Sequence, residues 1–184
     1  MATQSDICDF GWQAVDFSLK GVDGGQHSLQ SARGENGLLV AFICNHCPYV
    51  KRVIARLVAD AKVLQENGIG VIAIMPNDTE NHPADSFENM QVFAQESGFT
   101  FPYVIDETQA TARAYEAVCT PDFFGFNKDL HLQYRGRLDS AGATEPTGGE
   151  TRELLEAMLA IGKTGKGPQK QVASMGCSVK WREE

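Results

Sequence analysis

A run of apolar residues leads directly into a pair of cysteines in the segment GLLVAFICNHCP, residues 37–48. The apolar part, residues 37–43, has the length of a strand and no polar interruption. Such a run is typical of a strand that is buried on both faces of a sheet. We therefore expect Cys44 and Cys47 to lie at the end of a buried strand.

The residues that follow the cysteine pair predict a long amphipathic helix. Pro48 suits the first helical turn, apolar side chains recur at helical spacing from Val50 to Leu64, and Gly68 is a stop signal. Residues 69–75 are again apolar and predict a second buried strand. Strand, helix and strand together form a parallel, right-handed crossover, so the predicted fold class is α/β.

Further elements flank this central unit. The other predicted strands cover residues 14–19, 26–29, 101–105, 122–126 and 130–134, and the other predicted helices cover 83–96, 108–117 and 150–161. Turn-forming residues at 23–25 and 127–129 join the first two and the last two of these strands into hairpins. Asp85 and Glu88 have the spacing of a capping box for the helix over 83–96.

Length and charge narrow the class of protein. The chain has 184 residues, which suits one domain, expected over 1–161, followed by an irregular tail over 162–184. The formal net charge of −8 repels phosphate backbones and anionic headgroups, so neither nucleic acid nor a membrane is expected as a partner. Residues 1–12 lack the pattern of a leader peptide, and no apolar run is as long as a membrane span, so we expect a cytoplasmic protein.

The CxxC pair is the strongest chemical signal in the chain. Thiols three residues apart at a helix N-terminus are expected to share one face of the helix within disulfide reach, and the positive helix end lowers their pKa. His46 and Lys51 are expected to add positive charge in the same place and to tune the pair in the same direction. We therefore predict that Cys44 and Cys47 are catalytic, with a redox potential above the thioredoxin value of about −270 mV.

Structural zinc is the main alternative for a CxxC sequence. Zinc takes four ligands and usually uses a second spaced pair of them, whereas the remaining cysteines here stand alone. An intracellular CxxC beside a strand–helix–strand unit favours redox chemistry. The prediction is therefore an enzyme that needs no metal ion and no bound cofactor.

Several segments carry a resemblance to a known family. They are VDFSLK (15–20), FICNHCP (42–48), Thr120-Pro121 and the ending MGCSVKW (175–181). Over about residues 10–140 the chain resembles thioredoxin-like redoxins and peroxiredoxin-like proteins of the AhpC/TSA type. The resemblance implies a thioredoxin-like fold with an N-terminal β-hairpin extension and a central mixed sheet flanked by helices. It also implies a cis peptide bond at Thr120-Pro121 that faces the cysteine pair and the substrate.

The resemblance implies two oxidoreductase activities. In the thioredoxin arrangement Cys44 attacks a protein or small-molecule disulfide, Cys47 resolves the mixed disulfide, and a cellular thiol reductant restores the pair. In the peroxiredoxin arrangement Cys47 attacks a peroxide, as an antioxidant, and Cys44 resolves. That second pattern has threonine at the position of Cys44 and proline at the position of Val40. It also has an arginine near Pro121, for which Arg113 is the nearest candidate. Thiol–disulfide exchange is therefore the expected activity, with thiol peroxidase as the alternative.

A few residues leave other interpretations open. Ile43 and Leu38 stand where thioredoxin has a tryptophan and a buried acid. Cys119 and Cys177 are candidate additional thiols, Cys177 as a resolving thiol that folds back, although each can equally be structural. A metal-binding module that combines the CxxC pair with His131, as copper carriers of this fold do, is a third hypothesis. A binding module without catalysis is the fourth.

Overall fold

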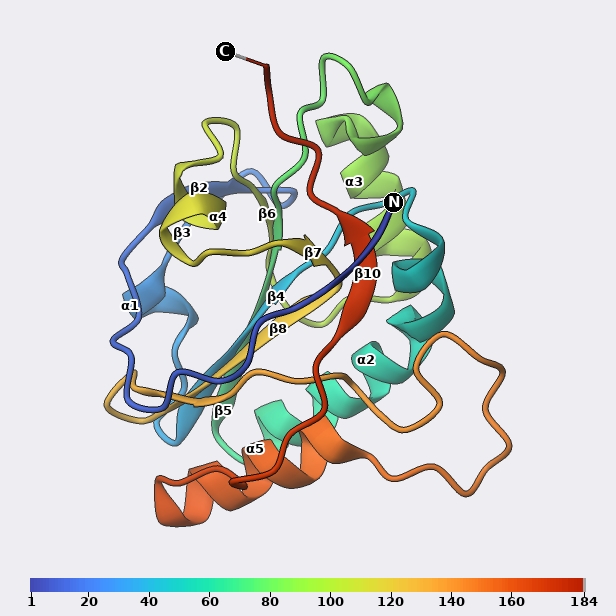
Figure 1. Cartoon of the computed structure of the whole chain (residues 1–184). Coiled ribbons are helices and arrows are strands. Elements are labelled where there is room, and N and C mark those ends of the chain that lie inside the picture. Colours follow the sequence, from blue (N-terminus) through green and yellow to red (C-terminus); the bar gives the residue numbers. More distant parts are fainter. Residues whose placement is uncertain (184) are drawn as a thin grey trace.

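The computed structural model describes residues 1–183, which form a seven-stranded sheet and a smaller three-stranded sheet (Figure 1). The strands are β1 Ala2–Gln4, β2 Ser18–Gly21, β3 Gln26–Ser28, β4 Gly37–Phe42, β5 Ile69–Met75, β6 Tyr103–Ile105, β7 Cys119–Thr120, β8 Asp122–Asn127, β9 Leu132–Tyr134 and β10 Met175–Ser178. The helices are α1 Leu29–Ala32, α2 Pro48–Glu66, α3 Phe87–Ser97, α4 Ala110–Ala114 and α5 Glu153–Thr164, with a short 3₁₀ helix, η1, over Pro83–Asp85. The large sheet has the order β3-β2-β6-β5-β4-β8-β9, and the small sheet has the order β1-β10-β7.

The strand that precedes the cysteine pair, β4, lies inside the large sheet. It pairs in parallel with β5 and antiparallel with β8. All residues of β4 are buried: Leu39 and Ala41 face one hydrophobic cluster, and Leu38 and Val40 face the other. The doubly buried strand and the parallel crossover through α2 are thus confirmed.

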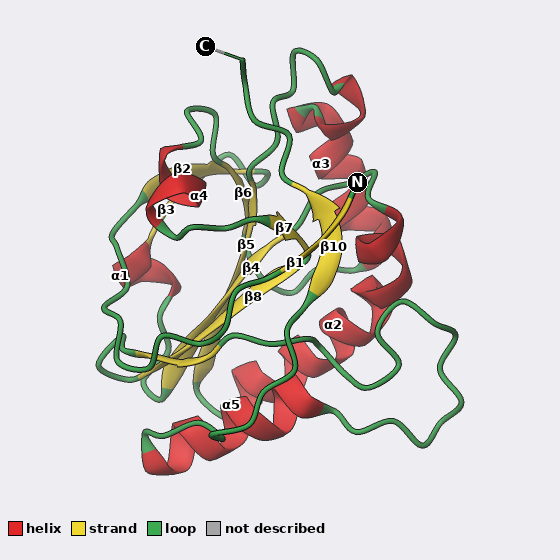
Figure 2. Cartoon of the chain, in the orientation of Figure 1, coloured by secondary structure: helices red, strands yellow, loops and turns green. Residues whose placement is uncertain are grey.

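Helices cover both faces of this sheet (Figure 2). On one face α2, α3 and α5 bury side chains such as Leu57, Met90 and Leu154. On the other face α1 and α4 bury Leu29 and Ala112. This mixed sheet between two helical layers is the predicted architecture, and it places the β4–α2 junction at one end of the core.

The N-terminal hairpin forms, but its first strand is displaced from the predicted position. The predicted strand over 14–19 is wrong for its first half, because strand β2 begins at Ser18 and pairs with β3. Residues before it bond elsewhere: Gln13 forms a bridge with His131, and the Ala14 N–H donates to the carbonyl of Leu130. The second predicted hairpin is confirmed as β8 and β9.

The predicted helix over 83–96 is divided at Ser86. This residue is the N-cap of α3, where its side chain accepts the N–H of Asn89. The capping box expected from Asp85 and Glu88 is therefore wrong, and the Asp85 carboxylate is free for other partners. The last helix likewise begins later than expected, because the carboxylate of Glu150 bonds the N–H groups of its own turn, at Thr147 and Gly148.

The prediction of an irregular tail over 162–184 is wrong for residues 175–178. These residues form β10, which pairs with both β1 and β7 and so becomes the middle strand of the small sheet. Gly176 permits this pairing, because a Cβ atom there would lie 2.0 Å from the carbonyl oxygen of Thr120. Figure 1 shows β10 beside the N-terminal strand, near the start of α2. Within 1–183, no helix combines the length and the apolar character that crossing a bilayer requires.

Candidate active site

The cysteine pair lies in the loop between β4 and α2. The helix begins at Pro48 with Cys47 as its N-cap, so Cys44 precedes the helix, and the expectation that both thiols share a helical face is wrong. The loop nevertheless brings their side chains together, because both sulfurs contact Thr120 and each cysteine shifts the pKa of the other. Both are free thiols, with exposed fractions of 1% and 0%.

The Thr120-Pro121 segment contacts both sulfur atoms. Its peptide bond is cis, as the resemblance implied. Cys44 Sγ lies 3.4 Å from Thr120 Oγ1, and Cys47 Sγ lies 3.1 Å from the carbonyl oxygen of Thr120. The carbonyl contact favours the protonated thiol of Cys47 because a carbonyl oxygen only accepts hydrogen bonds. The cis segment therefore forms one wall of the site, as predicted.

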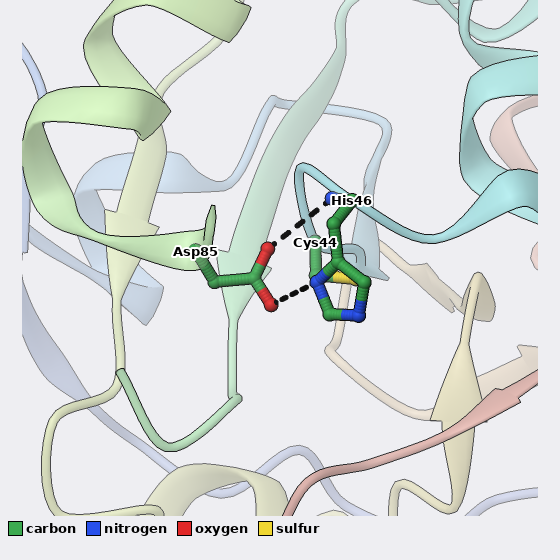
Figure 3. A group of neighbouring side chains, drawn as sticks. All are labelled: Cys44, His46 and Asp85. Carbon is green, nitrogen blue, oxygen red and sulfur yellow. Dashed lines mark hydrogen bonds and ion pairs between the residues drawn. The ribbon is translucent and has the colours of Figure 1, made fainter. Parts of the chain in front are cut away.

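A buried carboxylate holds the loop from its other side (Figure 3). Asp85, at the end of η1, is fully buried. Its Oδ1 accepts the backbone N–H groups of Asn45 at 2.8 Å and His46 at 3.3 Å. Its Oδ2 accepts from Asn77 Nδ2 at 2.8 Å and lies 2.6 Å from His46 Nδ1. The carboxylate thus fixes both residues between the cysteines.

The side chain of Asn45 completes this support. Its Oδ1 accepts the hydroxyl of Tyr103 at 2.8 Å, and its Nδ2 donates to the carbonyl of Ala84 at 3.2 Å. Burial raises the pKa of Tyr103 well above its usual value, so the phenol stays protonated and remains a donor. Sequence patterns gave no indication of Asn77 or Tyr103, because each comes from a distant segment. The spacing of Asp85 and Glu88 predicted a capping box, whereas the partners of Asp85 are in the CxxC loop.

The two sulfurs differ in acidity, and Cys47 is the more acidic of the pair. The hydrogen bond from Cys44 lowers the pKa of Cys47 to about 4, helped by the Cys177 side chain and the Val50 backbone N–H and opposed by burial. The pKa of Cys44 is raised by the same hydrogen bond, by burial and by the charge of Asp85. Cys47 is therefore the sulfur that ionises first, although its 3.1 Å contact with the Thr120 carbonyl favours its thiol form.

Of the two additional candidate thiols, the structure brings one to the site. Cys177 lies on β10 directly opposite Thr120, and its pKa is raised to about 11 by burial and by Cys47. Cys119 precedes Thr120 in β7, so its side chain points to the opposite face of the strand, and its Sγ lies 3.5 Å from the carbonyl oxygen of Pro121. Burial raises the pKa of Cys119.

Three further predicted residues lie outside this cluster. Lys51 is exposed in the first turn of α2. Arg113, the nearest arginine candidate for activating peroxide, places its guanidinium 4.6 Å from the ring centre of Trp181. The carbonyl of His131 accepts the N–H of Asn127, the last residue of β8. Asn127 pairs with Gly37, which is the first residue of β4, whereas the cysteines follow the last residue of β4. A metal site that combines the CxxC pair with His131 is therefore excluded.

Cys44, His46 and Asp85 each place a ligand-type atom within 4.8 Å of the others (Figure 3). These three residue types also bind zinc, so the fit to a metal ion needs a test. Both oxygens of Asp85 already accept hydrogen bonds, and an ion would displace the ones from the CxxC loop. The cluster is built to hold the loop, and it offers three ligands where a structural zinc site uses four.

A cavity of about 260 Å³ adjoins the cis segment. It is lined mainly by apolar groups, among them Tyr49 of α2, Pro121, Phe123 and Met175 of β10. The cavity therefore lies beside the cis Thr120-Pro121 segment, between α2 and β10. Neither CxxC cysteine lines this cavity; Pro121, which follows Thr120, joins it to the wall of the site.

Comparison with known proteins agrees with this geometry. The profile of the AhpC/TSA family matches residues 10–135. A crystal structure of an uncharacterized conserved protein from Geobacillus kaustophilus superposes with a TM-score of 0.91 at 42% identity, covering 100% of this chain and 98% of that one.

Two thiol-disulfide oxidoreductases also match. ResA from Geobacillus thermodenitrificans is 26% identical over 127 residues, which are 69% of this chain and 68% of ResA. The thioredoxin domain of a thiol-disulfide oxidoreductase from Bacteroides vulgatus has a TM-score of 0.58 at 16% identity, covering 68% and 86% of the two chains, and shows the fold alone. The chain therefore belongs to the AhpC/TSA family and has the thioredoxin-like fold.

Proposed function

We propose that this protein is a thiol-disulfide oxidoreductase that cycles Cys44 and Cys47 between the dithiol and the disulfide. One observation carries the proposal: two free thiols lie at the start of α2, and the cis Thr120-Pro121 segment contacts both. The similarity to ResA, a thiol-disulfide oxidoreductase, supports the same activity.

The first step is a nucleophilic attack by Cys44. Its thiol passes the proton along the hydrogen bond to the Cys47 thiolate and attacks one sulfur of the substrate disulfide. A bond forms between Cys44 and that sulfur, and the substrate's S–S bond breaks. The second substrate sulfur leaves as a thiolate and takes up the proton from Cys47, which thereby becomes a thiolate again. The product of this step is a mixed disulfide on Cys44.

The second step is resolution by Cys47. Its sulfur attacks Cys44 Sγ, the mixed disulfide breaks, and the remaining substrate sulfur leaves as a thiolate. The α2 N-terminus favours the Cys47 thiolate at this stage, because the Val50 N–H lowers its pKa. The substrate has then gained two electrons, and the enzyme carries a Cys44–Cys47 disulfide. A cellular thiol reductant returns the enzyme to the dithiol.

The substrate and the location of the protein are further parts of this proposal. We place the substrate side chain in the 260 Å³ cavity beside Pro121, because Pro121 follows the threonine that contacts both sulfurs, which are themselves buried. The apolar lining suits an apolar side chain next to the disulfide of a protein or small molecule. The net charge of −8 supports a partner that is neither nucleic acid nor membrane. A cytoplasmic location remains our proposal.

Stopped-flow mixing of the reduced protein with oxidised glutathione tests the activity. We expect wild-type protein to form a Cys44–Cys47 disulfide, Cys47→Ser to stop at a mixed disulfide on Cys44, and Cys44→Ser to react about 100-fold more slowly. Cys8→Ser is the matched control, because Cys8 is a free thiol packed against the opposite hydrophobic cluster. The proposal fails if Cys44→Ser retains wild-type exchange.

The pKa of about 4 for Cys47 favours a second candidate function, a thiol peroxidase in which Cys47 attacks peroxide and Cys44 resolves. The position of Arg113 against Trp181 argues against it, since the predicted arginine is not at the site. Mixing the same variants with hydrogen peroxide decides between the two. Rapid peroxide consumption that survives Cys44→Ser and is abolished by Cys47→Ser would establish the peroxidase.

A further inference from the structure

The strand β10 places Cys177 on the face of the small sheet that meets the active site. Cys177 pairs directly with Thr120 in the antiparallel β7–β10 ladder. Residues directly opposite in such a ladder project their side chains to the same face. The Thr120 hydroxyl points at Cys44, 3.4 Å from its sulfur. The Cys177 side chain therefore points toward the same pair.

Contact between Cys177 and Cys47 confirms this orientation. The two thiols influence each other: Cys177 lowers the pKa of Cys47, and Cys47 together with burial raises that of Cys177. Cys177 also packs against the hydrophobic cluster that contains both CxxC sulfurs. Cys47 thus has a sulfur partner on each side, Cys44 from its own loop and Cys177 from β10.

Hydrogen bonds hold the chain in this position directly after Cys177. Val179 N–H donates to the carbonyl of Val118, and Lys180 N–H donates to Asn77 Oδ1 at 2.9 Å. The same Asn77 donates to Asp85, the carboxylate that holds the CxxC loop. The segment with Cys177 and the loop with Cys47 are therefore tied to one polar network, so their juxtaposition is built into the fold.

We propose that Cys177 is a third redox thiol that exchanges with Cys47, so that the enzyme's disulfide alternates between Cys44–Cys47 and Cys47–Cys177. The inference rests on the proposed function, which supplies the first disulfide. In the exchange the Cys177 thiolate attacks Cys47 Sγ, an S–S bond forms between them, and the Cys44–Cys47 bond breaks. Cys44 leaves as a thiolate and takes the proton that Cys177 gave up. The step is an isomerisation and needs no outside oxidant.

Exposure and charge both favour moving the disulfide from Cys44–Cys47 to Cys47–Cys177. Cys44 and Cys47 are covered almost completely, whereas Cys177 is half-buried, so moving the disulfide brings it toward an outside reductant. The charged Cys47 raises the pKa of Cys177 in the reduced enzyme, and Lys180 lowers it. Once Cys47 is in a disulfide it carries no charge, so Cys177 ionises more easily at the stage when its attack is needed.

Disulfide mapping by mass spectrometry tests the exchange. Reduced Cys44→Ser protein is treated with one equivalent of diamide, its free thiols are alkylated, and its peptides are mapped. We expect an intramolecular Cys47–Cys177 disulfide. The same disulfide is expected in Cys44→Ser/Cys8→Ser, a matched control because Cys8 is also half-buried with a pKa raised to about 11. Cys44→Ser/Cys177→Ser removes it. Absence of this disulfide in Cys44→Ser overturns the proposal.

A second measurement uses the wild-type active site. We expect oxidised wild-type protein, alkylated at low pH, to contain both the Cys44–Cys47 and the Cys47–Cys177 disulfide. We also expect oxidised Cys177→Ser to be reduced by glutathione about tenfold more slowly than wild type. Reduction at the wild-type rate, with only Cys44–Cys47 found, overturns the third thiol and leaves the proposed function intact. A wild-type protein that forms no CxxC disulfide overturns both.

Discussion

At the scale of single residues, the chemistry of the site depends on where one proton is held. Cys47 receives hydrogen bonds from Cys44, from Cys177 and from the start of α2, whereas Cys44 lies beside the buried Asp85. The asymmetry is electrostatic: groups that lower the pKa outweigh burial and the Thr120 carbonyl at Cys47, whereas Cys47, burial and the Asp85 carboxylate raise the pKa of Cys44. A sequence pattern that only places both thiols near a helix end cannot distinguish the two.

The low pKa of Cys47 makes the stability of the reduced protein depend on pH. The folded pKa of about 4 lies below the usual value of 9.0, so the thiolate stabilises the folded state fully above pH 9 and loses this contribution as pH falls through 4. We expect the free energy of unfolding of wild type, relative to Cys47→Ser, to rise between those pH values by at most about 1.4 kcal/mol per pH unit. Urea unfolding of both proteins across that range measures it, and a pH-independent difference contradicts it.

Asp85 is expected to set the pKa of Cys44 and the shape of the loop. In Asp85→Asn the charge that raises the pKa of Cys44 is lost, so this pKa falls, and the buried contacts to His46 and Asn45 weaken by about 1–3 kcal/mol in total. The pH profile of iodoacetamide labelling reports the pKa. Asp106→Asn is the control, because Asp106 is equally buried but bonds the backbone of α4. If both variants change thiol labelling alike, the effect of Asp85 is only structural.

At the scale of elements, local patterns predicted β4, α2 and β5 well and the surrounding contacts poorly. These elements are predictable from local sequence, because the apolar strand, the proline and the helical spacing are all in the segments that directly flank the cysteines. Asp85 and Cys177 reach the site through contacts between distant segments. The spacing of apolar residues carries no information about contacts between distant segments. For this reason sequence patterns predict a helix cap for Asp85 and an irregular tail over 162–184.

Gly176 is the residue on which the β7–β10 pairing depends most directly. In Gly176→Ala the new Cβ would lie 2.0 Å from the Thr120 carbonyl oxygen, so β10 must move away from β7. We expect the reduced variant to be alkylated at Cys47 and Cys177 at least about tenfold faster than wild type, because these thiols lose their cover. Gly149→Ala is the matched control, since a Cβ there meets nothing within 4 Å. Equal labelling of both variants would show that β10 does not cover the site.

At the scale of the whole molecule, the small sheet joins segments from both ends of the described chain over the active site. β1 pairs with β10, and β10 pairs with β7, whose last residue precedes the cis proline. The cysteine pair after β4 of the large sheet is thereby linked to β10, the strand that carries Cys177. The N-terminal and C-terminal segments are for this reason part of the site, although the family profile covers only residues 10–135.

The redox potential of the Cys44–Cys47 pair depends on all the groups that shift the pKa values of the two thiols. The pH dependence of this potential identifies the protonation state of the reduced pair. Stabilising a thiolate favours the reduced enzyme, so we expect a potential above about −270 mV at neutral pH. Between pH 4 and 9 the reduced pair holds one proton, on Cys44, and the potential should fall by about 30 mV per pH unit. Below pH 4 both thiols are protonated, and the slope should approach about 59 mV per unit. Titration against glutathione buffers at several pH values gives both numbers. A slope near 59 mV through neutrality would mean that Cys47 is a neutral thiol held by the Thr120 carbonyl, and the charge assignment would then be wrong.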